Sequence, residues 1–419
     1  MYFTRGGRQV TVALLPVLVF LLAGTGRAHA QSTAAPPVVK WNNGLDISTA
    51  DGANDFQLGA LIELDGRFGL DDPLHDVNDT FVMRRVRPIF QGRVAKYFEF
   101  RVMPDFGNGQ TVLFDAYFDV RFSKTFRVRL GKDKTPLGLE QLYADYTLLL
   151  PERTLVTNLV PNRDVGVQVQ GEVAGGILNY IGGVVNGIPD GTNGDIDTNT
   201  AKDLEGRLTA RPFNRAKEPA LRGFGVAVGA TSGREAGALP SYRSTAQQTF
   251  FSYAAGVVAD GNRTRVSPSA FYYYKSLGAF AEYAHNTQAV RGTTTSADLT
   301  HTAWEVTASY VLTGEPTSDR GVIPARPFDP ALHHWGALQV VARHSRLNLD
   351  PAAFATGLAA ANSNHTASAT GVAALLYANA YIKYVLSFER TVFDDNPNGT
   401  RPPEHALVFR LQLNLQPTL

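Results

Sequence analysis

The chain of 419 residues contains no cysteine. It therefore lacks a disulfide framework, a thiolate nucleophile and cysteine ligands for a metal. It also lacks any apolar run that reaches the roughly 20 residues of a membrane-spanning helix. The apolar run at residues 10–23 is shorter than that. A helical membrane protein is excluded, and the other apolar residues have to form strands or a globular core.

The N-terminal residues have the pattern of a signal peptide. Arg5 and Arg8 precede the apolar run, and Ala28-His-Ala30 supplies a small-x-small cleavage pattern. We expect residues 1–30 to be cleaved off and the rest to be exported. Residues 31–54, rich in proline, asparagine and glycine, are predicted to be a periplasmic N-terminal segment.

Sequence motifs of enzymes are missing. There is no Gly-x-Ser-x-Gly, no His-Glu-x-x-His and no phosphate-binding glycine loop. A lipase pair at His344-Ser345 is disfavoured, because neighbours in a strand face opposite ways, and the same argument applies to metal binding by His333-His334. We therefore expect no enzyme, no cofactor, no metal and no nucleic-acid partner.

Alternation with period two is clearest near the C-terminus. Between residues 404 and 415 the apolar Leu407, Phe409 and Leu411 face one way, while Val408 and Arg410 face the other. Such a strand fits a transmembrane barrel with lipid outside and water inside. Sixteen segments follow similar rules, and most can be read as the ~9–11 residues that a tilted membrane strand needs. They lie at 56–69, 79–94, 97–106, 111–122, 126–133, 164–172, 177–186, 201–212, 221–231, 263–274, 277–288, 302–313, 333–348, 366–378, 381–394 and 404–415.

The fold class is therefore predicted to be all-β, a 16-stranded antiparallel transmembrane β-barrel over residues 55–419. Short and long connections alternate, except that 314–332 is long where a short turn is expected. The connection 134–163 is too apolar for a free surface loop, so we expect this third loop to fold inward and narrow the pore. The alternative is an outward loop packed on a neighbouring subunit. Residues 232–262 are expected to form an ordered external loop.

Basic residues gather in one predicted strand. Residues 81–96 contain Arg84, Arg85, Arg87 and Arg93 and no carboxylate. Alternation places the last three of these arginines toward water, and Arg84 toward lipid, where a charge at mid-depth costs roughly 2–4 kcal/mol. Arg84 must then lie near the rim, in a subunit contact or beside a bulge.

The arginines allow two interpretations. A guanidinium wall in a narrow pore attracts anions and pairs with phosphate oxygens. Alternatively, Asp115 and Asp119 on neighbouring strands neutralise the arginines in cross-strand pairs. The candidate residues of an anion path are Arg84, Arg85, Arg87, Arg93, Asp115, Arg129, Lys132 and Lys134.

Several stretches resemble the phosphate-selective porin O/P family. They are Phe81-Val-Met-Arg84-Arg85-Val-Arg87, Asp115-Ala-Tyr117, Arg129-Leu-Gly131-Lys-Asp-Lys134-Thr-Pro136-Leu-Gly138, Val311-Leu-Thr-Gly314-Glu315, Gly336-Ala337, Ala342-Arg343-His-Ser345, Ala380-Tyr-Ile-Lys-Tyr384, Glu389-Arg390-Thr391 and Arg410-Leu-Gln-Leu413. The resemblance implies a trimeric outer-membrane porin whose inward third loop and basic residues pass phosphate-type anions. It assigns the family's arginine pair to Arg84-Arg85, its pore aspartate to Asp115 and its glycine-lysine segment to Lys132 or Lys134.

The function expected from these observations is passive uptake of small anions, phosphate or polyphosphate, through a water-filled channel in the bacterial outer membrane. The expected partners are these anions, outer-membrane lipid and two further copies in a homotrimer. Two alternatives stay open. One is a general diffusion porin without phosphate selectivity, and the other is a non-conducting barrel that serves as a scaffold or adhesin.

Overall fold

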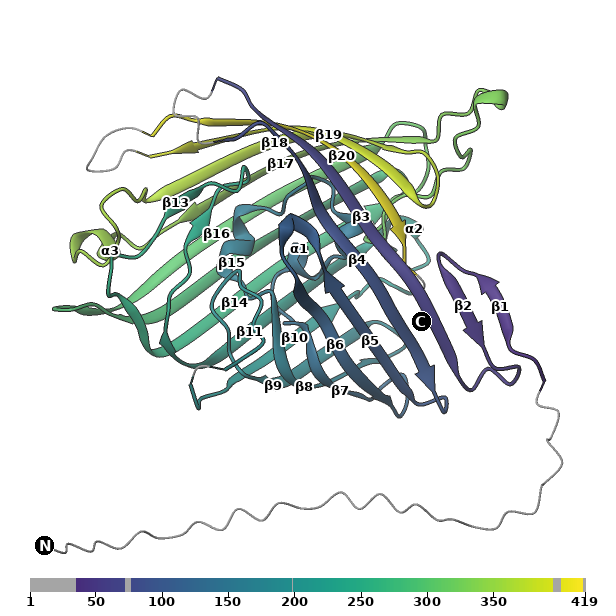
Figure 1. Ribbon diagram of the computed structural model, residues 1–419, viewed down its shortest axis with the longest axis horizontal. Coiled ribbons are helices and arrows are strands. Elements are labelled where there is room, and N and C mark those ends of the chain that lie inside the picture. Colours follow the sequence, from purple (N-terminus) through teal and green to yellow (C-terminus); the bar gives the residue numbers. More distant parts are fainter. Residues whose placement is uncertain (1–34, 72–76, 198, 395–400, 417–419) are drawn as a thin grey trace, which may run out of the picture. The chain divides into compact units, whose positions relative to one another are not determined.

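Sixteen antiparallel strands close into a barrel in the computed structural model, which describes residues 35–71, 77–197, 199–394 and 401–416 (Figure 1). Each wall strand pairs with the next along the chain, and the last pairs with the first. The wall strands are β3 (Asp55–Gly69), β4 (Thr80–Val94), β5 (Phe98–Asp105), β6 (Val112–Arg121), β7 (Arg127–Lys134), β8 (Arg163–Val173), β9 (Leu178–Val185), β10 (Asp203–Ala210), β11 (Phe224–Gly237), β14 (Val258–Tyr274), β15 (Leu277–Arg291), β16 (Ser296–Val311), β17 (Ala337–Asn348), β18 (Thr366–Tyr377), β19 (Ile382–Phe393) and β20 (Glu404–Leu415).

The remaining elements are short. Two hairpins are not among the sixteen wall strands. They are β1 (Val38–Trp41) with β2 (Leu45–Ser48), and β12 (Tyr242–Arg243) with β13 (Thr249–Phe251). The helical turns are η1 (Gly107–Gly109), α1 (Leu139–Leu142), η2 (Asp145–Thr147), η3 (Leu155–Leu159), α2 (Pro219–Arg222), η4 (Pro330–Leu332) and α3 (Pro351–Ala355). Within the described ranges, no helix has the length and apolar character to cross a membrane.

The predicted fold class is confirmed, and each of the sixteen predicted segments corresponds to one wall strand. Four boundaries differ from the prediction by more than three residues. β11 and β14 both continue into the predicted loop 232–262, β16 begins at residue 296 where residue 302 was expected, and β17 begins four residues later than expected. The delay has a local cause, because η4 is followed by His333 in a left-handed conformation with φ 53°. The predicted signal peptide lies outside the described residues, and the predicted segment 31–54 contains the hairpin β1–β2, whose β2 pairs with the start of β3.

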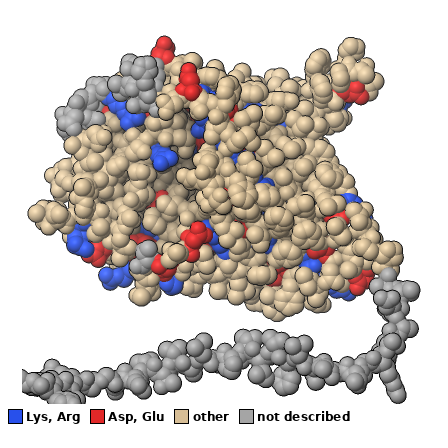
Figure 2. Space-filling view, viewed as in Figure 1, with Lys and Arg blue, Asp and Glu red and all other residues tan. Residues whose placement is uncertain are grey.

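The two faces of the wall differ as the alternation predicted. In β20, Val408, Arg410 and Gln412 are buried on the inner side, while Phe409 is 43% exposed on the outer side. The outer face carries large exposed apolar side chains such as Phe81 and Phe118. Figure 2 shows a broad surface with few charged side chains on the face that it draws. A surface of this kind suits the hydrocarbon of a membrane.

The connection 135–162 folds into the barrel, which confirms the inward third loop. Its backbone is held by side chains from the wall. Lys383 of β19 donates to the carbonyls of Tyr146 and Leu148 at 2.8 and 3.0 Å, and Arg410 of β20 donates to the carbonyl of Pro151 at 2.7 Å. Figure 1 shows α1, which belongs to this loop, among the strands of the barrel. The wall thus satisfies carbonyl groups that an inserted loop would otherwise leave unpaired.

A second connection also folds inward, and this was not predicted. Tyr242 and Phe251 of the hairpin β12–β13 are buried against Leu155 and Val156 of the third loop in one apolar cluster. The expectation of an external loop over 232–262 is therefore wrong. The connection folds inward because Phe250 and Phe251, which are 1% and 0% exposed, would be costly to leave in water.

Candidate functional site

A bulge in β4 brings two neighbouring arginines to the same side of the wall. Glu63 of β3 lies opposite Arg85, whereas the next residue of β3, Leu64, lies opposite Met83, so Arg84 is the extra residue. The turn η1 packs on this bulge, and a Cβ at Gly107 would lie 2.5 Å from the carbonyl oxygen of Arg84. Of the three positions proposed for Arg84, the structure has the one beside a bulge.

Arg84 reaches the third loop through its bulge. Its Nε donates to Glu152 Oε1 at 2.6 Å, and its Nη2 donates to Glu152 Oε2 at 2.8 Å. Arg67 of β3 also pairs with Glu152. The carboxylate of the loop is therefore held between two guanidinium groups of the wall.

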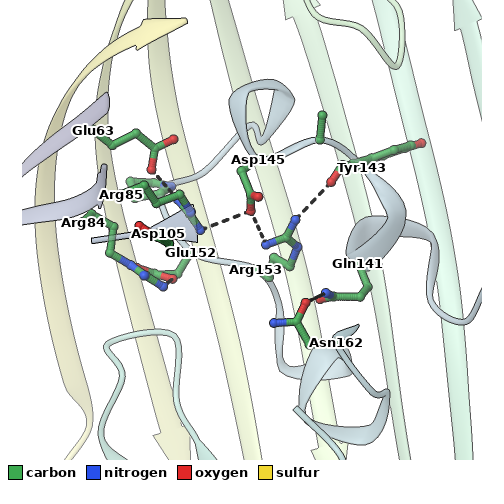
Figure 3. A network of polar contacts seen from close by, with 12 residues as sticks. Glu63, Arg84, Arg85, Asp105, Gln141, Tyr143, Asp145, Glu152, Arg153 and Asn162 are labelled. Carbon is green, nitrogen blue, oxygen red and sulfur yellow. Dashed lines mark hydrogen bonds and ion pairs between the residues drawn. The ribbon is translucent and has the colours of Figure 1, made fainter. Parts of the chain in front are cut away.

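Arg85 and Arg87 meet the same loop at a second carboxylate, that of Asp145. Figure 3 shows Arg85 and Arg153 directed toward this carboxylate. Arg85 pairs with Glu63 and lies 3.5 Å from Asp145 of η2, and Arg87 pairs with Asp145 and with Asp105, the latter at 2.7 Å. Arg153 of the loop donates to Asp145 at 2.7 Å from the other side. Asp145 is thus surrounded by three arginines, two from the wall and one from its own loop.

A second bulge, in β6, adds an aromatic ring to this wall. Met103 lies opposite Asp115, whereas Pro104 lies opposite Leu113, so Phe114 is the extra residue. The guanidinium carbons of Arg87 and Arg163 lie 4.0 and 4.4 Å from the centre of its ring. Cation–π contacts with this one ring help to hold the two arginines in position.

The other predicted residues are distributed along the wall. Asp115 pairs with Arg101 at 3.0 Å and with Arg163 at 2.8 Å. Lys134 donates to the carbonyls of Tyr143 and Leu142 in the third loop at 2.6 and 3.3 Å. These two residues therefore join the group around the loop.

Three predicted residues lie apart from that group. Arg129 pairs with Asp119 and Asp133, and its guanidinium carbon lies 3.7 Å from the ring centre of Tyr117. Arg93 pairs with Glu99 at 3.4 Å near the short turn after β4, and Lys132 pairs with Asp195 of the connection between β9 and β10. All eight predicted residues have partners within the protein.

Cavities follow this wall at three successive levels of β4. The first has a volume of about 360 Å³ and reaches Arg84 and Arg85, the second has about 130 Å³ and reaches Arg87, and the third has about 240 Å³ and reaches Gln91. Each is lined by four basic and two acidic side chains. The basic residues are Arg84, Arg85, Arg153 and Arg243 in the first cavity, Arg87, Arg101, Lys134 and Arg163 in the second, and Arg101, Arg121, Arg127 and Arg129 in the third.

The loop carboxylates are kept ionised by their surroundings. Burial alone would raise the pKa of Glu152, but the guanidinium groups of Arg84 and Arg67 outweigh it and hold that pKa well below its usual range. Burial likewise opposes ionisation of Asp145, and Arg87, Arg153 and Arg85 together hold its pKa well below normal. Both loop contacts are therefore ion pairs at neutral pH.

Several partners at the site were not predicted as site residues. They are Glu63, Asp105, Phe114, Asp145, Glu152, Arg153, Arg163 and Arg243. Glu63 and Asp105 could have been predicted as partners of the arginines, because both are at inward-facing positions in the strands on either side of the arginine-rich strand. Phe114 could not have been predicted, because alternation without the bulge directs its side chain to lipid. The contacts of the loop residues could not be predicted either, because they depend on how the loop crosses the barrel.

A closed barrel with an apolar outer face, a charged inner wall and an inserted third loop has the architecture of the outer-membrane porins. Residues 56–415 match the family described as phosphate-selective porin O and P. The chain belongs to this family, whose members are channel proteins of the outer membrane. No curated protein matches the chain significantly.

Solved outer-membrane proteins share the fold. The outer membrane channel DcaP of Acinetobacter baumannii is 10% identical, with a TM-score of 0.55 over 88% of this chain and 99% of that one. The anion-selective porin from Comamonas acidovorans is also 10% identical, with a TM-score of 0.54 over 86% and 99%. The trimer form of OmpT from Vibrio cholerae is 11% identical, with a TM-score of 0.52 over 86% and 99%. At these identities the likeness extends to the barrel fold alone.

Proposed function

We propose that the channel passes small anions by passive diffusion, phosphate-type anions among them, along the wall formed by β4 to β8. The observation that carries this proposal is the twofold excess of basic over acidic side chains at each of the three cavity levels. Glu63 and Asp105, which pair with Arg85 and Arg87, reduce this excess without removing it. The eight predicted residues remain the proposed anion path.

The dimensions of the path decide whether this excess governs selectivity. Salt at ~0.15 M screens charges beyond roughly 8 Å, so in a wide pore a few arginines would have little effect on which ions pass. The third loop forms ion pairs with the arginine wall, so it occupies part of the lumen beside these residues and narrows the space left for an ion. Arg85 is 2% exposed, and its Nε has no hydrogen-bond partner among the described residues. Arg85 lines the first cavity, and we propose that an anion there accepts a hydrogen bond from this donor.

We further propose that the channel is a homotrimer in the outer membrane. The outer face of the barrel is largely apolar, and a homotrimer would bury part of it between subunits while lipid covers the rest. A trimer form is known for OmpT of Vibrio cholerae, which shares the fold. Export by a cleaved signal peptide at residues 1–30 remains a prediction from the sequence.

Reversal potentials across planar bilayers in a salt gradient test the selectivity. We expect the wild-type channel to prefer anions, and Arg84→Gln with Arg85→Gln to shift the potential toward cation preference. Arg93→Gln is a comparison within the proposed path: this arginine lies near the short turn and its side chain is 28% exposed, so its loss should shift the potential less. Asp115→Asn should shift it the opposite way. A cation-selective wild-type channel would refute the proposal.

A second candidate function is general diffusion without phosphate selectivity. It is favoured by one observation, which is that every arginine of the predicted path already has a carboxylate partner. Block of chloride current by phosphate separates the two functions. Anion preference without such block would leave the general diffusion porin, and absence of conductance would leave the non-conducting scaffold.

A further inference from the structure

A polar row crosses four neighbouring strands on the outside of the barrel. His344 of β17 pairs in register with Thr370 of β18, Thr370 with Arg390 of β19, and Arg390 with His405 of β20. All four residues have the outward parity of their strands, and Thr370 and Arg390 are exposed. The row lies close to the long connections, the rim that faces the exterior in outer-membrane barrels.

Hydrogen bonds connect the members of this row. His344 Nδ1 lies 2.7 Å from Thr370 Oγ1, and Arg390 Nε donates to His405 Nε2 at 3.2 Å. One step nearer the rim, the exposed Arg346 donates to Asn348 at 2.8 Å. In the described part of the chain neither Arg346 nor Arg390 has a carboxylate partner.

The outer wall around these arginines is positively charged and otherwise uncharged. None of the outward residues of β17 to β20, all of which are described, is an aspartate or glutamate. Arg291 of β15 is also outward, but it pairs with Asp260 of β14 at 2.6 Å. Arg346 and Arg390 therefore lack the compensation that Arg291 has.

The surface directly below the row is apolar. The next outward residues toward the middle of the wall are Ala342, Val372, Phe388 and Leu407, and Val372 is 51% exposed. Farther along, Leu386 and Phe409 are 51% and 43% exposed. The row thus marks the level at which the outer face changes from apolar to basic. An amphiphile with an anionic head group would meet both surfaces at once.

We propose that Arg346 and Arg390 bind the phosphate groups of a phosphorylated lipid in the outer leaflet, while its acyl chains lie along Val372, Leu386 and Phe409. Arginine matches phosphate oxygens with two parallel donors, and the interfacial position lowers competition from water. The site is on the outer surface, so it is independent of the selectivity proposed for the lumen.

Native mass spectrometry of the protein in detergent tests the site, with bis-phosphorylated lipid A as the probe and lipid A that lacks one phosphate as the comparison. Basic side chains at an anionic surface contribute about 1 kcal/mol each, so Arg346→Gln with Arg390→Gln should weaken binding roughly tenfold or more. The charge-conserving Arg346→Lys with Arg390→Lys should restore the part of the binding that depends on charge, but not the part that depends on the paired donors of arginine. Arg234→Gln, an outward exposed arginine of β11, is the matched control and should leave binding unchanged.

Two outcomes would overturn the inference. Equal binding to wild type and the double glutamine variant would show that the arginines do not hold the lipid. Loss of subunit association in that variant, with lipid binding retained, would assign the face to a second copy of the chain. The reversal potential serves as a check on folding, because neither substitution changes the lumen.

Discussion

Arg84 of β4 holds Glu152 of the third loop through two parallel hydrogen bonds of 2.6 and 2.8 Å. A guanidinium and a carboxylate in this arrangement form a directional ion pair. The pair exists because the bulge at Arg84 redirects a side chain that simple alternation would send into lipid. It connects the wall to the loop that narrows the lumen.

Substitutions of Arg84 and Glu152 should lower stability by similar amounts but shift ion selectivity in opposite directions. Arg84→Gln and Glu152→Gln each break a largely buried pair, and each should lower the free energy of unfolding by about 3–5 kcal/mol. Arg84→Gln removes a positive charge from the lumen and should shift the reversal potential toward cations, whereas Glu152→Gln should shift it toward anions. Denaturant unfolding in lipid vesicles and bilayer recordings measure the two effects. Shifts of the same sign would mean that the residues act only through loop position.

The attachment of the loop should weaken in acid. The pKa values of Glu152 and Asp145 are lower in the folded protein than in the unfolded chain. Their ion pairs therefore stabilise the fold fully above about pH 4–5, near the unfolded values, and this stabilisation is lost as the pH falls toward the folded values. The unfolding temperature of the wild type should fall from pH 6 toward strongly acidic pH. Glu152→Gln should show a smaller fall, and an equal fall would place the acid sensitivity elsewhere.

Shortening the third loop should widen the channel. Replacing residues 144–150 with two glycines removes the part whose carbonyls Lys383 binds. A sixteen-strand wall without an inserted loop leaves a wide aqueous channel, so single-channel conductance should roughly double or more. Circular dichroism and oligomer mobility verify folding of the deletant. Unchanged conductance in a folded deletant would mean that the constriction lies elsewhere, with the hairpin β12–β13 as the next candidate.

Phe114 should contribute to stability and leave selectivity unchanged. Phe114→Leu removes two cation–π contacts, each worth roughly 0.5–2 kcal/mol, and should lower the free energy of unfolding by about 1–4 kcal/mol. All charges of the lumen remain, so the reversal potential should stay at the wild-type value. The neighbouring Asp115→Asn removes a charge and should change that potential. A large shift for Phe114→Leu would indicate that the ring orders Arg87 and Arg163 for anion contact.

Local patterns in the sequence were sufficient for the wall. Alternation in segments such as β20 follows directly from the geometry of a strand between lipid and water, so one residue predicts the direction of the next. The inward third loop was predicted for a similar reason, because Leu148, Leu149 and Leu150 are too apolar to remain in water. The hairpin β12–β13 carries a comparable apolar pair in Phe250-Phe251, although the expectation for residues 232–262 is an external loop.

The sequence by itself determined the strand order, the closed barrel and the side of the wall on which most arginines lie, because these depend on the nearest neighbours along the chain. Only the tertiary structure decided which charges meet. The bulges at Arg84 and Phe114 change the parity of single residues, and a bulge arises from pairing between two strands. The contacts of Asp145 and Glu152 depend on the path of a loop through the barrel, which joins residues 58 to 68 positions apart. Long-range pairing of this kind is set by the closed wall around the loop.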